Sequence, residues 1–322
     1  MAKHKRSLMI KLGILTLITL LSITFYIFWD INFKILHYQL PSRLTRIWAM
    51  ILMAIAIGVS TTLFQTISRN RILTPSIMGL DAAYLFIQTL LVFIFGATSQ
   101  AMMNTHLNFF IAMISLVTFT MLLFGYMFNK TAQSIFKLLL IGVILGTLFQ
   151  SLASFVQMLI NPDDFLILQN TMFASFNAIQ SELLIIGTVI IVLLVIVIYI
   201  YYLPYLDVMG LGRDHAINLG VEYDKIVKQL LFIVAILVSV STALVGPITF
   251  LGLLIVNLAH EFIKSHKHSH ILYTTVLFGI LSLIGAQAIV QYIMQQETEI
   301  SVLINFIGGI YFIFLIIKES RS

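Results

Sequence analysis

The sequence predicts an all-α integral membrane protein with about ten transmembrane helices and with its N- and C-termini in the cytoplasm. Of its 322 residues, 60% are hydrophobic and 10% are charged. A soluble chain of this composition has too few polar side chains to cover its surface, whereas a bilayer can solvate the apolar excess. Apolar runs of about 20 residues, the length that crosses the hydrocarbon layer, recur along the chain. They are 7–28, 47–67, 76–96, 108–128, 136–158, 182–203, 228–246, 249–264, 271–293 and 301–317.

Three of these runs need comment. The first follows Lys3, Lys5 and Arg6, as the apolar region of a signal peptide would. It is too long for that, and no small-x-small cleavage site follows, so we interpret it as a retained helix. The third and eighth runs begin beside Gly or Pro and have the least defined limits. Irregular backbone at membrane depth is tolerated only where protein or a cavity covers it.

The basic residues set the orientation of the helices. If the N-terminus is inside and the sides alternate, 15 of the 18 Lys and Arg residues are cytoplasmic and 3 are outside. The outer three are Lys34, Arg43 and Arg46. Translocation of such residues is unfavourable, so the asymmetry supports an even number of spans. The net charge of +5 therefore reflects membrane topology, and no nucleic-acid partner is expected.

Two connections are long enough to have a role of their own. The outer one, 159–181, holds the turn signal Asn-Pro-Asp-Asp at 161–164 and a stretch that could form a short surface helix. The inner one, about 204–225, is the most polar part of the chain. Its glycines and polar residues predict two short helices that lie on the membrane face. The whole chain, 1–322, is interpreted as a single transmembrane permease domain that includes both connections.

The sequence offers little for an enzyme. No Gly-Lys dipeptide occurs, so there is no P-loop, and we find no metalloprotease, nucleophile-elbow or dinucleotide-binding motif. No cofactor is expected, and the absence of cysteine excludes thiolate metal sites. His266, His268 and His270 could bind a metal, but a solvated loop is the simpler reading. Asp81 could be an ion site or a helix-start carboxylate near the cytoplasmic interface; the second is favoured.

Three segments carry recognisable motifs. The first holds Arg-Leu-Thr-Arg at 43–46, Gln65, and Arg-Asn-Arg-Ile-Leu-Thr-Pro at 69–75. The second is Leu-Gly-Arg-Asp-His-Ala-Ile-Asn-Leu-Gly-Val at 211–221, and the third is Gly-Pro-Ile-Thr-Phe-Leu-Gly-Leu at 246–253. In order and spacing they resemble the FecCD-type permeases, which import iron–siderophores, haem and cobalamin. The Met-Gly-Leu-Asp run at 78–81 looks most like the branch that handles catecholate siderophores.

The resemblance implies a pore of two ten-helix subunits, with two ABC ATPase subunits below it and a substrate-binding lipoprotein above. Arg43 and Arg46 match family arginines that pair with acidic residues of the lipoprotein, although both could simply reach lipid headgroups. The coupling loop that contacts the ATPase would contain Leu211, Gly212, Arg213, Asp214, Ala216, Leu219 and Gly220.

Five further residues are expected beside the pore or at a helix break: Gln65, Pro75, Gly246, Pro247 and Gly252. The Gly246–Pro247 pair has a backbone reason for this, because Pro removes a hydrogen-bond donor and Gly permits unusual dihedral angles. Such a break can expose polar backbone to a cavity; a plain turn between helices is the equal alternative.

The chain also departs from the family pattern. Arg71 replaces a Pro, Asn257 lies where a Pro-His pair is frequent, and Gln291 replaces a third outer arginine. These losses favour a heterodimer with a related permease, with a homodimer as the alternative.

We therefore expect a permease subunit of an ABC importer that moves ferric siderophores across the bacterial cytoplasmic membrane. A permease of the same family for haem or cobalamin is one alternative. An ion-coupled secondary transporter, with Asp81 as its essential carboxylate, is another.

Overall fold

The computed structural model describes residues 2–30, 34, 36–130, 135–177, 179–295 and 297–319, and the regular elements of these residues are helical. The predicted basic residue Arg321 lies outside them. The helices are α1 (Ala2–Phe28), α2 (Leu36–Ser68), α3 (Leu80–Phe95), α4 (Gln100–Met103), α5 (Thr105–Lys130), α6 (Ile135–Gln157), α7 (Pro162–Gln169), α8 (Ser181–Val197), α9 (Leu203–Met209), α10 (Arg213–Asn218), α11 (Tyr223–Val245), α12 (Leu251–Ile263), α13 (His268–Ala288) and α14 (Ile300–Glu319).

Each of the ten predicted runs forms an apolar helix, which confirms the all-α membrane fold. In the described residues, eight helices are long and apolar enough to cross a bilayer alone. The other two, α3 and α12, have 16 and 13 residues. They correspond to the third and eighth runs, those that begin beside Gly or Pro. At 1.5 Å per residue, α12 is only about 20 Å long, so it covers part of the membrane thickness.

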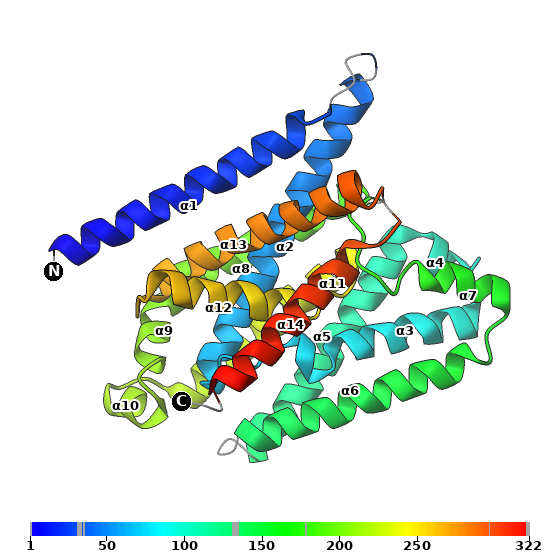
Figure 1. Cartoon of the computed structure of the whole chain (residues 1–322). Helices are drawn as coiled ribbons and strands as arrows, with labels where there is room; N and C mark the ends of the chain where they lie inside the picture. The colour runs from blue at the N-terminus through cyan, green and yellow to red at the C-terminus, as the bar shows by residue number, and fades with distance from the viewer. Residues whose placement is uncertain are drawn as a thin grey trace.

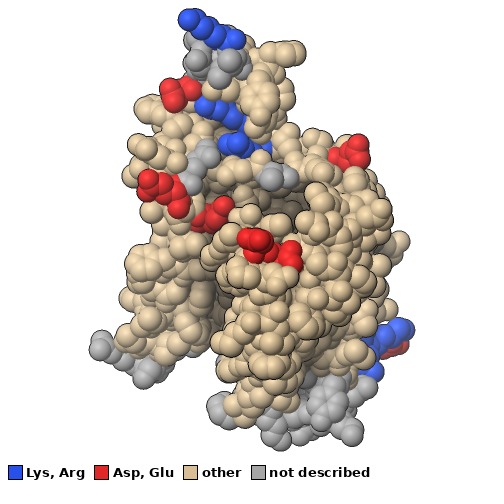
Figure 2. All heavy atoms as spheres, turned by 90° about the vertical axis from the view of Figure 1, so that its right-hand side faces the viewer, with Lys and Arg blue, Asp and Glu red and all other residues tan. Residues whose placement is uncertain are grey.

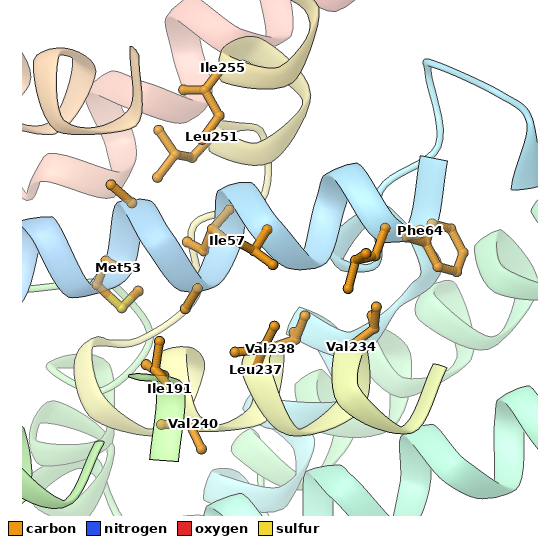
Figure 3. Packing of buried hydrophobic residues seen from close by; sticks show 14 of the residues in the cluster. Met53, Ile57, Phe64, Ile191, Val234, Leu237, Val238, Val240, Leu251 and Ile255 are labelled. Carbon is orange, nitrogen blue, oxygen red and sulfur yellow. The ribbon is translucent and has the colours of Figure 1, made fainter. Parts of the chain in front are cut away.

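Helix α2 forms the centre of the bundle (Figure 1). Figure 3 shows it between α11 on one side and α12 on the other, with Ile57 and Phe64 among the buried side chains. Lipid tails are as apolar as these side chains, so helix association depends on close packing rather than on the hydrophobic effect. The close contacts involve small residues. A Cβ at Gly58 would lie 2.9 Å from Thr275, and one at Gly279 would lie 2.8 Å from Ala54.

Contacts between helix ends show the relative directions of α1, α12, α13 and α14, in which α13 runs opposite to α12 and α14. Near one end of the molecule, Lys11 Nζ donates to the Phe262 carbonyl, and Lys318 Nζ donates to Glu261 at 2.7 Å. Near the other end, Tyr292 of the π-helical segment Ile289–Ile293 donates to the carbonyl of Trp29. The first end carries most of the basic residues and is the predicted cytoplasmic face; we call the opposite end the outer face.

The inner connection differs from the prediction. Helix α8 continues through the π-helical segment Ile198–Tyr202 directly into α9, so residues 181–209 form one long helix. Pro204 does not end it; it lies two residues after the π-helical segment, inside this continuous helix. Only α10 is a separate short helix. On the outer side, the predicted surface helix is α7, which begins at Pro162.

Candidate translocation site

Two helix breaks meet inside the bundle. The chain leaves α2 at Ser68 and folds back, so that Pro75 and Ser76 lie against Ile57 and Thr61 of α2. A 3-10 turn, η2 (Ser76–Met78), then leads into α3. The second break separates α11 from α12 at residues 246–250, and Gly246 borders the same small cavity as Pro75. In Figure 1, α3 and α12 extend from this region toward opposite ends of the molecule.

Glycines permit this arrangement. Gly79 has φ of +88°, and a Cβ there would lie 2.7 Å from the Gly146 Cα of α6. Gly246 has φ of +102°, and a Cβ there would lie 3.0 Å from the backbone of Ala174. Gly252 packs on Thr61. The structure thus places a real helix break at Gly246–Pro247, whereas the sequence left a plain turn open.

A cavity of about 430 Å³ lies beside the two breaks. Its wall combines η2 and α3 with α6, the 246–250 break and α14. The polar lining side chains are Ser76, Asp81, Thr147, Gln150, Thr249, Ser301 and Asn305, and Pro247 also borders the cavity. None of the described residues in this wall is Lys or Arg. Non-helical backbone at membrane depth therefore adjoins a cavity whose wall combines polar and apolar side chains, as expected where a substrate passes.

Asp81 lies in this wall, in the first turn of α3. Its Oδ2 accepts a hydrogen bond of 2.6 Å from Thr249 Oγ1, which joins the two breaks. Asp81 is 8% exposed, and its Oδ1 has no hydrogen-bond partner among the described residues. The prediction that Asp81 lies near the cytoplasmic interface is wrong, because α3 begins inside the bundle after the chain has folded back.

Two amides hold the folded-back segment in place. Gln65 Nε2 donates to the Arg71 carbonyl at 2.6 Å, and Asn257 Nδ2 donates to the same carbonyl at 3.0 Å. Asn257 also donates to Leu253 within α12. Two of the departures from the family pattern, Arg71 and Asn257, are therefore in contact. Gln65 lies beside the break, as expected, but its amide group serves the backbone; a role in the pore itself stays a prediction.

The predicted coupling loop lies at the basic end of the molecule. Gly212 has φ of +112° and packs against the Arg69 guanidinium, 3.2 Å from where its Cβ would be. Arg213 pairs with Asp224 at 3.2 Å, and Ala216 is buried. Asp214 and Gly220 are exposed. Leu211 and Leu219 are 58% and 63% exposed. Exposed apolar side chains on a polar loop fit a surface that a partner protein covers.

His268 connects this loop to the transmembrane helices. Its Nδ1 lies 2.8 Å from Asp207 Oδ1 of α9, and its Nε2 lies 3.0 Å from Thr66 Oγ1 of α2. The Asp207 carboxylate also accepts from the His268 backbone N–H. The solvated-loop reading is therefore wrong for His268, which is 7% exposed. In the described residues, no group of three or more His, Cys, Asp or Glu could hold a metal ion.

On the outer face, Arg43 is 5% exposed. Its guanidinium donates to four carbonyls at the end of α1, those of Tyr26, Ile27, Trp29 and Asp30, at 2.6–3.2 Å. The C-terminus of a helix carries partial negative charge and free carbonyls, and therefore favours a bound cation. Arg43 therefore caps α1 in this conformation, and its role in docking stays a prediction.

Arg46 lies beside the Tyr26 phenol, and its Nε has no partner among the described residues. The Tyr26 hydroxyl donates to Gln291, the residue that replaces a family arginine.

Figure 2 shows the outer face, which is hollowed, with acidic side chains around the hollow and Lys and Arg side chains above it. The acidic residues of the outer connections include Asp163 on α7, Glu182 at the start of α8, and Glu297, and all three are exposed. The polar surface at this face therefore includes exposed carboxylates as well as basic side chains, whereas the sequence had pointed to the two arginines.

Comparison with known proteins identifies the family. The model of the FecCD transport family matches residues 9–318. The chain belongs to this family. It is 47% identical to the petrobactin import system permease protein YclO of Bacillus subtilis over 97% of this chain and 98% of that protein. It is 33% identical to FatC, a petrobactin import permease of Bacillus anthracis, over 86% of this chain and 78% of that protein.

A solved structure of a metal-chelate type ABC transporter in an inward-facing conformation has the same fold. Its TM-score is 0.79 at 23% identity, and the match covers 97% of this chain and 99% of that one. Family membership and the apolar helices make the chain a multi-pass permease of the cytoplasmic membrane.

Sequence reasoning missed three features of the site. Asp81 was misplaced, and neither the Asn257 contact with Arg71 nor the His268 contact with Asp207 was foreseen. Asn257 and Arg71 had both been noted as departures from the family pattern, but their contact uses the Arg71 backbone carbonyl, which any residue supplies, so these departures gave no signal of it. The His268–Asp207 pair left no signal, because 61 residues separate its partners.

Proposed function

We propose that this chain is a membrane-spanning permease subunit of an ABC importer for ferric siderophores, with petrobactin-type chelates as the first candidates. The observation that carries the proposal is the match to a petrobactin permease along 97% of the chain. The cavity at the two helix breaks supports it, because it offers a path that does not expose unpaired backbone to lipid. The whole of 1–322 is one permease domain in this proposal.

The partners in this proposal are an ABC ATPase, a binding lipoprotein and a second permease subunit. Helix α6 supports the last of these. Its Thr147, Gln150 and Ser151 are exposed on the single chain, on one face of a membrane helix. Polar side chains at this depth usually face another helix or a water-filled cavity. A second permease subunit that packs on α6 and α14 would enclose the cavity. We favour a related chain over a second copy, on the basis of the family departures.

The coupling loop, about 204–225, is proposed to transmit ATPase movement. The His268 contacts with Asp207 and Thr66 connect α9 to α2 and α13, so displacement of the loop would pull on helices that border the breaks. In this proposal the chain itself carries out no covalent chemistry, and nucleotide hydrolysis takes place on the ATPase.

Uptake of radioactive iron tests the proposal. Cells that lack this chain are expected to lose uptake from ferric petrobactin, to regain it when the chain is supplied, and to lose it again when the P-loop Lys of the ATPase is replaced. Uptake that persists with the inactive ATPase would point to an ion-coupled carrier. Uptake that is unchanged in the deletion strain would contradict a transport role for this chelate.

A further inference from the structure

The Asp81 carboxylate is an unusual feature of the cavity wall. One of its oxygens is bonded to Thr249, and the other has no partner among the described residues. The Ser76 hydroxyl lies beside the carboxylate, but neither Ser76 nor Thr249 supplies a positive charge. No Lys or Arg belongs to the described wall. An ionised carboxylate that is buried without a counter-charge is strongly unfavourable, so the charged form of Asp81 needs a partner.

The surroundings of Asp81 limit which group can supply the missing positive charge. The helix N-terminus of α3 contributes partial positive charge, but it leaves Oδ1 without a donor. The remaining lining side chains are neutral hydroxyls, amides and apolar groups. The cavity volume of about 430 Å³ lies in the range of small-molecule sites. The missing partner can therefore be a group of the molecule that passes through the cavity.

We propose that Asp81 recognises a positively charged nitrogen, an ammonium group, on the transported iron chelate. This inference rests on the proposed function and adds the chemical class of substrate that the pathway prefers. The carboxylate pairs with the ammonium group, and Thr249 holds the carboxylate in place from the α11–α12 break. Asp81 would repel a chelate that carries only negative charge, so the same residue selects against it. A charge pair with a hydrogen bond in a buried site gives this selectivity.

The experiment compares two ferric chelates with the same iron-binding groups, one with a free amine and the other with that amine acetylated. Both are tested for ATP-dependent transport by the complete complex in proteoliposomes, with the same lipoprotein throughout. The readout is the ratio of the two transport rates. The lipoprotein's own preference cancels when this ratio is compared between the wild type and Asp81→Asn.

We expect the wild type to prefer the amine chelate and Asp81→Asn to reduce that preference about tenfold or more, while transport of the acetylated chelate continues. Asp81→Glu should keep part of the preference, because it keeps the charge. Asp163→Asn, the same change on exposed α7, should leave the ratio unchanged.

Two results would overturn the inference. An equal loss of both rates in Asp81→Asn would assign Asp81 a purely structural role between the two breaks, and an unchanged ratio would remove it from recognition. Transport of neither chelate by an ATPase-active wild-type complex would contradict the proposed function itself, which makes that failure distinct.

Discussion

Replacement of Gly79 by alanine is expected to destabilise the permease by roughly 2–5 kcal/mol. About 1–2 kcal/mol comes from the left-handed backbone conformation, which an L side chain disfavours. The rest comes from overpacking, typically about 1–3 kcal/mol, because the new methyl group would lie 2.7 Å from the Gly146 Cα. The nearest atoms, Cα and N of Gly146, belong to the backbone, so they cannot move away by a change of side-chain rotamer. Thermal unfolding of the purified protein in detergent measures the effect.

Gly220→Ala is the matched control for this prediction. Gly220 has φ of +85°, close to that of Gly79, and ends α10 in a left-handed cap in which the Val221 N–H donates to the Ala216 carbonyl, but nothing lies within 4 Å of its Cβ position. The control variant therefore has the unfavourable backbone conformation without the collision and should lose only about 1–2 kcal/mol. If both variants unfold at the same temperature, the close contact between η2 and α6 is not as tight as the structure shows.

Replacement of Leu219 by Asp is expected to reduce ATP-dependent transport at least tenfold while the transmembrane fold stays intact. Leu219 is 63% exposed, so the fold gains little from its side chain. If the ATPase covers it, the variant buries a charge in an apolar contact, which is strongly unfavourable. A tenfold change in binding corresponds to about 1.4 kcal/mol, well within the effect of such a change. Co-purification of the ATPase and the transport rate are the two measurements.

Leu166→Asp is the control for the loop variant. Leu166 is 61% exposed on α7, at the opposite face. It should leave ATPase co-purification unchanged. Full retention of the ATPase by Leu219→Asp would show that this part of the loop does not contact it.

The sequence was sufficient for the number and direction of the helices, because apolar length and the side of each basic residue are local properties. It was insufficient to predict how deep in the membrane each helix begins. Run 76–96 has the composition of an ordinary span, yet its first residues fold back along α2 and only 80–95 form the helix. That position depends on contacts with residues far away in the chain, such as Thr249 and Gly146. Asp81 was misplaced for the same reason.

In the site, too, the features that depend on the local backbone were predicted, and those that depend on distant contacts were not. The motif at 246–253 predicted a helix break, because Gly and Pro act on the local backbone. Arg43 was expected to be available on the outer surface, since it is one of three basic residues there. In the structure its guanidinium instead donates to four carbonyls at the end of α1, which no pattern in the sequence indicated. The number of charges on a face can be read from sequence, but their availability cannot.

Accessibility of single cysteines tests the central claim that the chelate passes the cavity beside the two helix breaks. The chain contains no cysteine, so Gln150→Cys on the cavity wall can be compared directly with Phe155→Cys, which is 62% exposed away from that wall. The account predicts that a membrane-impermeant thiol reagent labels Gln150→Cys in the assembled complex, that ferric chelate slows this labelling, and that Phe155→Cys is unaffected by chelate. Labelling of Gln150→Cys that is absent in every nucleotide state, or that the chelate does not change, would contradict it.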